Sequence, residues 1–394
     1  MNSSSHGWPA KVCARCLGRA FAKVGTGFSN TVRGNIVIFL YGILERPLPR
    51  IVEEINCDLC NGMISDISRY VQGIQSKLSG YEFGNFLVGS TFDEKTLEDE
   101  NAFQEHFGNI GESIRKEFNR ECGKELSIAL GKEAESGKPE ITINVDFRYD
   151  SIRIQSSSLC ISGFYRKFRR DLPQTRWIHM DRPGDSIEEI IGEPLREMTG
   201  SENFFLHGAG REDVDVRMLG NGRRFVIEAY RPMKRKIDLA GFTETVNSAG
   251  KGVEIFDTSF CNCSLIQEIK AEENFKSYEA RVEFESQVSR ETVLSAIMEL
   301  SGKVIYQRTP LRVSSRRSDL VRERLVRSME LRDFDGDHAT MRVTAQSGTY
   351  IKEMLHGDKG RTVPSLSSLC NSGVKVLELD VIQIHRGEHD DKDV

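Results

Sequence analysis

The stretch Leu206-His-Gly-Ala-Gly-Arg-Glu-Asp-Val-Asp-Val-Arg-Met-Leu-Gly-Asn-Gly222 separates two segments that have the composition of strands. Its four glycines and three acids disfavour a buried strand and an amphipathic helix, because glycine weakens both and buried acids need partners. Residues 203–206 before it are apolar, and Arg224–Tyr230 after it are rich in aromatic and branched residues. We therefore predict a loop held by two strands, a usual place for reactive side chains.

The composition of the chain is that of a soluble protein of two or three domains. It has 394 residues, of which 38% are hydrophobic and 29% charged, and a formal net charge of -5. We find no apolar run near the roughly 18–20 residues of a membrane-spanning helix and no secretory signal. The nine cysteines fit a reducing compartment, so we expect a cytoplasmic protein. The charge argues against indiscriminate coating of nucleic acid, although basic residues cluster locally.

Two Cys-x-x-Cys pairs, Cys13–Cys16 and Cys57–Cys60, lie in the first part of the chain. Four thiolates at this spacing suit a tetrahedral zinc ion, so we predict a structural zinc module at residues 1–62. The alternatives are free thiols that fill a core, and a redox role, which two pairs disfavour. We interpret the other cysteines as packing residues, because they form no second pair at ligand spacing: Cys122, Cys160, Cys261, Cys263 and Cys370.

Helical and alternating patterns are mixed in residues 63–172, which predicts an α+β domain. The segment Gly163–Trp177 at its end interleaves basic and aromatic residues. Cations bind phosphates and flat rings stack on bases, so this segment is typical of RNA binding. The alternative is an amphipathic strand with its basic side in water. The predicted RNA contacts are Arg166, Lys167, Arg169, Arg170 and Arg176.

Residues 173–394 are predicted to form a larger second domain. Asp185 followed by Glu188 is typical of a capped helix start, and Val374–Ile384 alternates as a strand does. The segment 308–327 holds seven arginines against two acids and should bind phosphate, because arginine can bind two oxygens of one group. The predicted contacts here are Arg308, Arg312, Arg316 and Arg317.

Several of these segments resemble one enzyme family. Gly210-Arg-Glu-Asp213 resembles the Gly-Arg-x-Asp motif that carries the catalytic aspartate of pseudouridine synthases. Lys276-Ser-Tyr278 resembles the strand that bears their active-site tyrosine, and Gly348-Thr-Tyr-Ile-Lys352 resembles the helix that bears their active-site cation. The basic segment Ile305–Val313 resembles one branch of this family. Together with the paired cysteines and the segment Arg166–Trp177, the set is similar to the tRNA pseudouridine synthases of the Pus ten family.

The resemblance implies an isomerase, an intramolecular transferase that converts uridine to pseudouridine in the T-loop of tRNA. Uridine 55 is the implied position, and in archaeal members also uridine 54. The implied α+β fold joins a zinc-bearing, THUMP-like RNA-binding region (1–62 and 63–172) to a synthase domain (173–394) with a mixed, mostly antiparallel sheet. We expect the T-arm of tRNA as partner, structural Zn²⁺ and no organic cofactor. We also expect a monomer without an obligate protein partner and without membrane contact.

The isomerisation breaks the N1–C1′ bond, turns the base and rejoins it through C5, so it needs a nucleophile or base at the sugar. The expected group is Asp213, which would attack the sugar or take its C2′ proton; both routes stay open. Lys352 would pair with Asp213, and Tyr278 would stack on the extruded base and assist proton removal from C5. Arg211 would contact a phosphate or fill the gap that the base leaves. Asp215 is the rival nucleophile.

Two positions depart from the family pattern: Glu279 and Ser315 stand where a basic residue and a histidine are expected. Two other functions stay open. One is a non-catalytic tRNA-binding or processing factor that uses the same domains. The other is a THUMP-bearing methyltransferase or thiouridine synthase, which predicts a nucleotide-binding glycine loop. The glycines of Gly208–Gly222 do not have that spacing.

Overall fold

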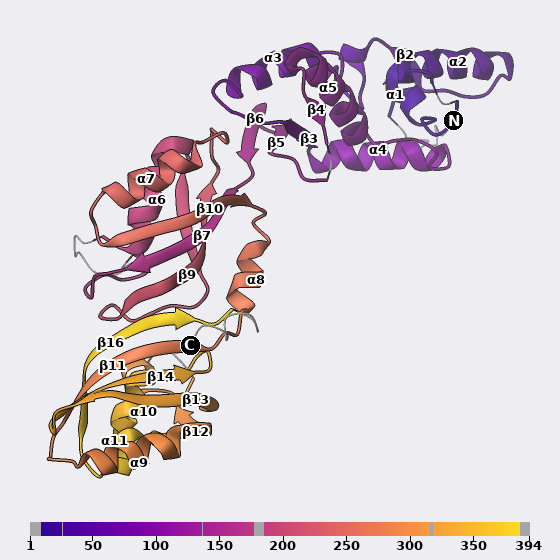
Figure 1. The fold of residues 1–394 in the computed structure, drawn as a ribbon. Coiled ribbons are helices and arrows are strands. Elements are labelled where there is room, and N and C mark those ends of the chain that lie inside the picture. The colour runs from indigo at the N-terminus through magenta and orange to yellow at the C-terminus, as the bar shows by residue number, and fades with distance from the viewer. Residues whose placement is uncertain (1–8, 26, 136, 177–184, 316–317, 387–394) are drawn as a thin grey trace. The chain divides into compact units, whose positions relative to one another are not determined.

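The computed structural model of the chain describes residues 9–25, 27–135, 137–176, 185–315 and 318–386. They fold into two compact units (Figure 1). The N-terminal unit contains the described residues up to Ser157 together with Arg231–Lys236, and the C-terminal unit contains Ser158–Tyr230 and the described residues from Ile237 onward. The paired cysteines share one hydrophobic core with residues up to Val145, so the zinc module and the THUMP-like domain predicted from the sequence lie in one unit.

The N-terminal unit combines helices with a four-stranded sheet of order β4-β3-β5-β6 and a two-stranded sheet, β1-β2. The elements are β1 (Lys11–Cys13), α1 (Ala14–Arg19), α2 (Asn30–Ile43), β2 (Arg50–Val52), η1 (Glu54–Asn56), α3 (Ile67–Lys77), β3 (Asn85–Thr91), α4 (Glu94–His106), α5 (Ile114–Leu130), β4 (Glu133–Ala134), β5 (Ile141–Asp146) and β6 (Ser151–Ser156).

Helix α5 shows why the sequence folds this way. Its buried residues, among them Phe118 and Leu126, recur at helical spacing and share a core with the alternate residues of β5. A cluster of three charged side chains is buried beside this core: the Arg19 guanidinium lies 3.0 Å from both Glu100 and Glu117. A buried charge without partners costs several kcal/mol, on the order of 3–5, so this triad ties α1 to α4 and α5.

The C-terminal unit is built on a ten-stranded sheet of order β10-β7-β9-β16-β11-β14-β13-β12-β15, with β8 beside β9. Among the described residues of this sheet, β9 and β16 alone pair in parallel, so the predicted mixed, mostly antiparallel sheet is confirmed. Its strands are β7 (Leu159–Lys167), β8 (Asn203–Gly208), β9 (Arg217–Tyr230), β10 (Val253–Cys261), β11 (Lys276–Phe284), β12 (Lys303–Arg308), β13 (Val321–Phe334), β14 (His338–Ala345), β15 (Thr362–Val363) and β16 (Val374–Ile384). The helices are α6 (Ile187–Thr199), α7 (Leu239–Ser248), α8 (Leu265–Ala271), α9 (Arg290–Leu300), η2 (Leu311–Val313), α10 (Ile351–His356), η3 (Gly357–Gly360) and α11 (Leu366–Cys370).

Strand β16 joins the two halves of this sheet. It pairs with β11 along most of its length, but with β9 only at Asp380↔Arg217 and Val381↔Met218. Ion pairs strengthen the short contact, because Asp380 accepts from Arg217 at 3.0 Å and lies 2.8 Å from Arg170. The predicted strand over 374–384 therefore holds the sheet together at its middle.

The division between the units differs from the domain boundary expected at 172/173. Strand β7 pairs with β9 and β10 inside the large sheet, so the compact units divide at Ser157. The segment that interleaves aromatic and basic residues begins as part of this strand. Tyr165 and Lys167 are buried and Arg166 between them is partly exposed, which is the alternation of an amphipathic strand.

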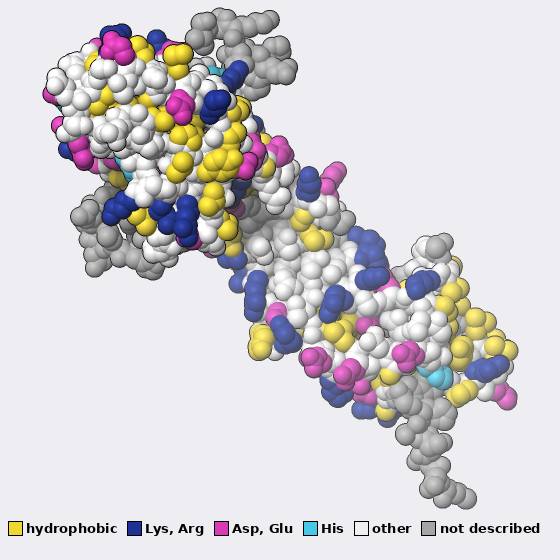
Figure 2. All heavy atoms as spheres, turned by 90° about the horizontal axis from the view of Figure 1, so that it is seen from below, with side chains coloured by type: hydrophobic (Ala, Val, Ile, Leu, Met, Phe, Trp, Pro, Cys, Tyr) yellow, Lys and Arg dark blue, Asp and Glu magenta, His cyan; other side chains and the backbone are white. Residues whose placement is uncertain are grey.

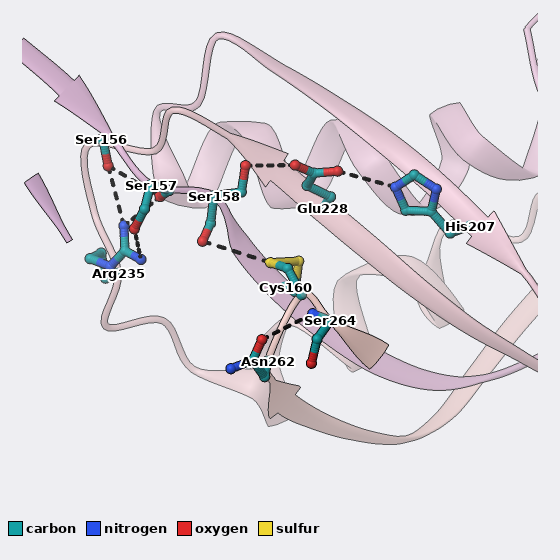
Figure 3. The surroundings of a disulfide bond; sticks show 10 residues. Ser156, Ser157, Ser158, Cys160, His207, Glu228, Arg235, Asn262 and Ser264 are labelled. Carbon is teal, nitrogen blue, oxygen red and sulfur yellow. Dashed lines mark hydrogen bonds and ion pairs between the residues drawn. A yellow bond between two sulfur atoms is a disulfide. The ribbon is translucent and has the colours of Figure 1, made fainter. Parts of the chain in front are cut away.

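A disulfide joins Cys160 of β7 to Cys263, two residues beyond β10 (Figure 3). The interpretation of these two cysteines as packing residues is therefore wrong. The two cysteines are 103 residues apart in the sequence, so their spacing did not predict a bond. They meet because β10 pairs with β7, with Cys261 opposite Cys160. Beside the disulfide, the Ser158 hydroxyl donates to Glu228 at 2.6 Å. Cys122 and Cys370 are buried thiols, as expected of packing residues.

Hydrophobic side chains gather on the surface at the end of the N-terminal unit that carries α2 (Figure 2). Phe39, Leu40 and Ile43 of this helix are exposed there. Within the described ranges, every helix is too short or too polar to cross a membrane.

Candidate active site

The loop is shorter than the glycine-rich stretch of the sequence. It comprises residues 209–216, because β8 ends at Gly208 and β9 already begins at Arg217. The two strands pair with each other and hold both ends of the loop. Gly210 has a φ of 84°, which glycine adopts without strain. A Cβ at this position would lie 3.1 Å from both Arg223 Nη1 and Lys276 Nζ, so the loop passes closely over two cations.

The loop forms one wall of a cavity of about 620 Å³. The other walls come from β9, β11, η2, β16 and the segment 347–352 that leads into α10, so distant parts of the chain meet here. This volume is typical of pockets for small organic groups. Charged and aromatic side chains of the lining include Asp213, Lys276, Tyr278, Arg312, Tyr350 and Lys352.

Asp213 lies between two cations in this cavity. Its Oδ1 accepts a hydrogen bond from Arg312 Nη1 at 3.0 Å, and its Oδ2 lies 3.7 Å from Lys352 Nζ. Its side chain is 35% exposed, so it is accessible to a ligand. The structure therefore brings Asp213 and Lys352 together as the sequence suggested, and it adds Arg312.

Lys352 is closer to Asp215 than to Asp213. Its Nζ lies 2.7 Å from both carboxylate oxygens of Asp215. Partial burial alone would raise the pKa of Asp215, but the hydrogen bonds and charge of Lys352 outweigh that effect and lower it. Asp215 lies outside the cavity lining and its side chain is 64% exposed. Lys352 thus bridges two carboxylates, of which Asp213 lines the cavity.

Arg312 is anchored by a second acid. Its Nε donates to Glu353 Oε1 at 2.6 Å, and the Glu353 side chain is buried. Burial alone would lower the pKa of Arg312, but the contacts with Glu353 and Asp213 outweigh burial and raise it. The guanidinium also lies over the ring of Tyr350, 5.9 Å from its centroid. A permanently charged group is therefore fixed beside Asp213.

Tyr278 lies on β11, on the same face of the sheet as Ala280 and Val282 of the core. Unlike them it is partly exposed, and it lines the cavity. Burial raises the pKa of Tyr278 to about 12, so it is a neutral phenol at physiological pH. Its ring is available for stacking.

A buried polar network lies beneath the loop. Glu212 Oε2 is 2.8 Å from Arg223 Nε, and its Oε1 accepts a hydrogen bond from the Tyr165 hydroxyl at 2.9 Å. Lys167 Nζ donates to the carbonyl oxygens of Asp213 at 3.2 Å and Val214 at 2.9 Å. These groups hold the backbone of the loop from below, while Asp213 points to the other side.

Comparisons with known proteins cover nearly the whole chain. A family model described as "Pus10, C-terminal" matches residues 160–385, and a model of the archaeal Pus10 THUMP domain matches residues 70–146. The tRNA pseudouridine synthase Pus10 of Thermoplasma acidophilum is 45% identical over 96% of this chain and 97% of its own length. The proteins of the same name from Picrophilus torridus and Methanothrix thermoacetophila are 45% and 35% identical, over 96% and 95% of this chain and 97% and 91% of theirs.

The chain belongs to the Pus10 family of tRNA pseudouridine synthases. It is therefore an isomerase. The C-terminal Pus10 model spans all the cavity residues, and the THUMP model spans the chain from within α3 to the end of β5.

In this Pus10 chain, the residues expected to bind RNA have different surroundings. Lys167 is fully buried and donates to three carbonyl oxygens, so it presents no charge to a ligand; this expectation was wrong, because the side chain faces the inner side of β7. Arg211 is exposed at the cavity wall. The others are at least partly exposed and paired with acids: Arg166 with Glu254, Arg169 with Asp171, Arg170 with Glu378, Arg176 with Glu188, and Arg308 with Asp319. Arg316 and Arg317 lie outside the described residues.

The four paired cysteines of the Pus10 chain form one cluster. The Sγ atoms of Cys13, Cys16, Cys57 and Cys60 all lie within 4.8 Å of one another, and all four residues are buried. The Sγ atoms of Cys13 and Cys60 are 3.8 Å apart. Four thiolates bound tetrahedrally at 2.3 Å would be separated by roughly 3.8 Å, so this donor set fits a metal ion such as zinc.

Sequence reasoning missed three residues in or beside the candidate site: Lys276, Arg223 and Glu353. Lys276 had a signal, because it stands two residues before Tyr278 on an alternating strand and therefore shares its face. The pairing of Glu353 with Arg312 had none, because it depends on how the turn before β13 folds back toward α10.

Proposed function

We propose that this chain isomerises uridine in the T-loop of tRNA, at position 55 and also at position 54, with Asp213 as the reacting carboxylate. The observation that carries this proposal is the position of Asp213, an accessible carboxylate in a cavity and within 4 Å of two cations. The tRNA pseudouridine synthases named above support tRNA as the substrate. The T-loop positions rest on the resemblance of the motifs alone.

The surroundings of Asp213 suit both routes that begin the reaction. To attack C1′, or to take the C2′ proton, its oxygen must be ionised and held in place. Arg312 Nη1 at 3.0 Å and Lys352 Nζ at 3.7 Å place two positive charges beside the carboxylate oxygens and help to orient them. The buried anchors below the loop restrict its backbone, so the carboxylate is positioned before the substrate arrives.

Tyr278 would stack on the target base. A uridine inside a folded tRNA arm must be extruded before its glycosidic bond can be reached, and an aromatic ring in the receiving pocket compensates for lost stacking. Arg211 at the cavity wall and Arg308 at the end of β12 are exposed cations that we propose as phosphate contacts.

The cysteine cluster would hold a structural zinc ion. Four buried thiols at tetrahedral spacing support zinc, and a closed site of this kind stabilises a fold without taking part in chemistry. Metal analysis of the purified protein should give one zinc per chain. Replacing Cys13 and Cys57 with Ser should abolish zinc binding and destabilise the N-terminal unit; metal-free wild-type protein with unchanged stability would contradict this assignment.

Position-specific detection of pseudouridine on an unmodified tRNA transcript tests the function. The wild type should modify position 55 and then position 54, and Asp213→Asn should modify neither while retaining tRNA affinity. Asp215→Asn is the matched control, because it removes the neighbouring acid that also contacts Lys352. Wild-type protein that binds the transcript but modifies no uridine would favour the non-catalytic binding factor. Pseudouridine at another position would contradict only the T-loop assignment.

A further inference from the structure

Lys276 is a buried lysine in the cavity wall that the proposed chemistry does not yet use. It is 8% exposed, and among the described residues its ammonium has no hydrogen-bond or ion-pair partner. It stands two residues before Tyr278 on β11, and both pair regularly with β14, opposite Ala345 and Val343. The two side chains therefore extend from the same face of the sheet into the same cavity.

The surroundings of Lys276 disfavour its charged form. Burial is the main cause and the nearby Arg223 guanidinium is the second, and together they lower the pKa of Lys276 to about 7. The acids that oppose this effect are Glu212 below the loop and Glu272 after α8. Glu212 is already 2.8 Å from Arg223 and accepts a hydrogen bond from Tyr165. A large share of Lys276 is thus a neutral amine at physiological pH.

The other groups of the cavity are less suited to accept a proton. Asp213 is assigned to the sugar, and the cations Arg312 and Lys352 are held by carboxylates. Tyr278 is a poor acceptor, because burial raises its pKa to about 12 and its phenol oxygen therefore already carries a proton at physiological pH. The sequence-based expectation that Tyr278 assists proton removal therefore has a better-placed alternative on the same strand.

We propose that the amine of Lys276 accepts the proton that leaves C5 of the target uracil once the base has been rejoined to the sugar through C5. This inference rests on the proposed function, in which Asp213 acts at the sugar. Lys276 would then be a second catalytic residue, which acts on the uracil, whereas Asp213 acts on the sugar.

The step is balanced in atoms and electrons. The base leaves with the N1–C1′ electron pair, and the C5=C6 π pair then forms the C5–C1′ bond, which leaves a double bond between N1 and C6. C5 now carries both C1′ and hydrogen. When Lys276 Nζ takes this proton, the C–H pair restores C5=C6 and the N1=C6 π pair moves to N1. N1 takes a proton from the new ammonium or from water, so no oxidant or reductant is needed.

The test compares Lys276→Arg and Lys276→Met with the wild type in single turnovers on tRNA transcripts made with ordinary or 5-deuterated uridine. Arginine keeps the positive charge but cannot act as a base. Lys276→Arg therefore distinguishes a lysine that accepts a proton from a lysine that only binds phosphate. Both variants should slow pseudouridine formation by ~10²–10⁴-fold. Both should show a primary deuterium isotope effect that the wild type lacks, because C5 deprotonation becomes rate-limiting. The tRNA affinity of Lys276→Arg should stay within about threefold of the wild type.

The pH dependence provides a second readout. The single-turnover rate of the wild type should fall as the pH drops through about 7, and this fall should be absent from Lys276→Arg. A Lys276→Arg variant with wild-type rate, or slow variants without an isotope effect, would overturn the proposal. The proposed function would survive either result, because it depends on whether the wild type makes pseudouridine and Asp213→Asn does not.

Discussion

Glu212 and Asp213 are neighbours in the chain, yet their carboxylates lie in opposite environments. The Glu212 side chain is 1% exposed and contacts Arg223 and Tyr165, whereas the Asp213 side chain is 35% exposed and lies in the cavity between Arg312 and Lys352. The contacts of Glu212 fix the loop, whereas Asp213 presents the accessible carboxylate that we propose to react. A short loop can therefore be rigid and accessible at once, because adjacent side chains point in different directions.

The largest expected effect is on the cavity side. Asp213→Asn should lower the rate of pseudouridine formation by ~10³-fold or more, because the amide can neither attack the sugar nor accept its proton. Its thermal midpoint should stay close to that of the wild type, because the side chain is partly exposed. Asp215→Asn serves as the control and should lose less than about tenfold in single-turnover rate. If both variants lost activity equally, the two carboxylates would not differ in role.

On the buried side the expected effect is on stability. Glu212→Ala leaves the Arg223 guanidinium buried without its acid, which should cost ~3–5 kcal/mol in the free energy of unfolding. Urea denaturation followed by circular dichroism measures this loss. Glu212→Gln keeps a hydrogen-bond acceptor for Tyr165 and should lose less. An unchanged unfolding midpoint for Glu212→Ala would remove the distinction between the two sides of the loop.

Lys352 tests how strongly Asp213 depends on its cations. Lys352→Met should reduce the single-turnover rate by ~10²-fold. The loss should not be larger, because the positive charge of Arg312 remains 3.0 Å from Asp213. Lys352→Arg should recover much of that loss, since it restores a charge that reaches both acids. A rate that does not respond to Lys352→Met would mean that Arg312 alone holds the aspartate.

The smallest expected effect concerns pH. Lys276 has a pKa of about 7 in the folded protein against 10.5 for an ordinary lysine, so between these values the unfolded chain binds more protons. The free energy of unfolding should therefore rise with pH across this window, by at most ~1.4 kcal/mol per pH unit from this group. Urea titrations at pH 7 and pH 9 should show the rise in the wild type and less of it in Lys276→Met. If the free energy of unfolding rose equally with pH in the two proteins, the pKa of Lys276 would not be lowered by folding.

Sequence reasoning succeeded where the information is local. The alternation of Val374–Ile384 predicts β16 with its observed bounds, and the two Cys-x-x-Cys pairs predict a cluster that the structure confirms. The start of α6 was predicted one residue early: Ser186 is the cap and Glu189 completes it, instead of Asp185 and Glu188. Either pair satisfies the same local pattern, so the sequence alone could not choose between them.

Sequence reasoning failed where tertiary pairing decides. Glycines within residues 217–222 disfavour a strand, yet β9 begins at Arg217 because β16 and β7 lie beside it. Lys167 has the composition of an RNA contact, but the pleat of β7 turns it inward. The disulfide between Cys160 and Cys263 follows from the neighbourhood of two strands that no local pattern reveals. Burial of polar groups was therefore the hardest property to predict.

The place of β16 in the sheet has a consequence for biosynthesis. β16 is the last strand in chain order among those described, but it lies between β9 and β11 at the centre of the sheet. While the ribosome is still making residues before 374, the strands on either side already exist but cannot be joined. The cavity takes Leu379 and Val381 from this strand, so its walls are incomplete until then. The cavity is therefore among the last features of the C-terminal unit to be completed during synthesis.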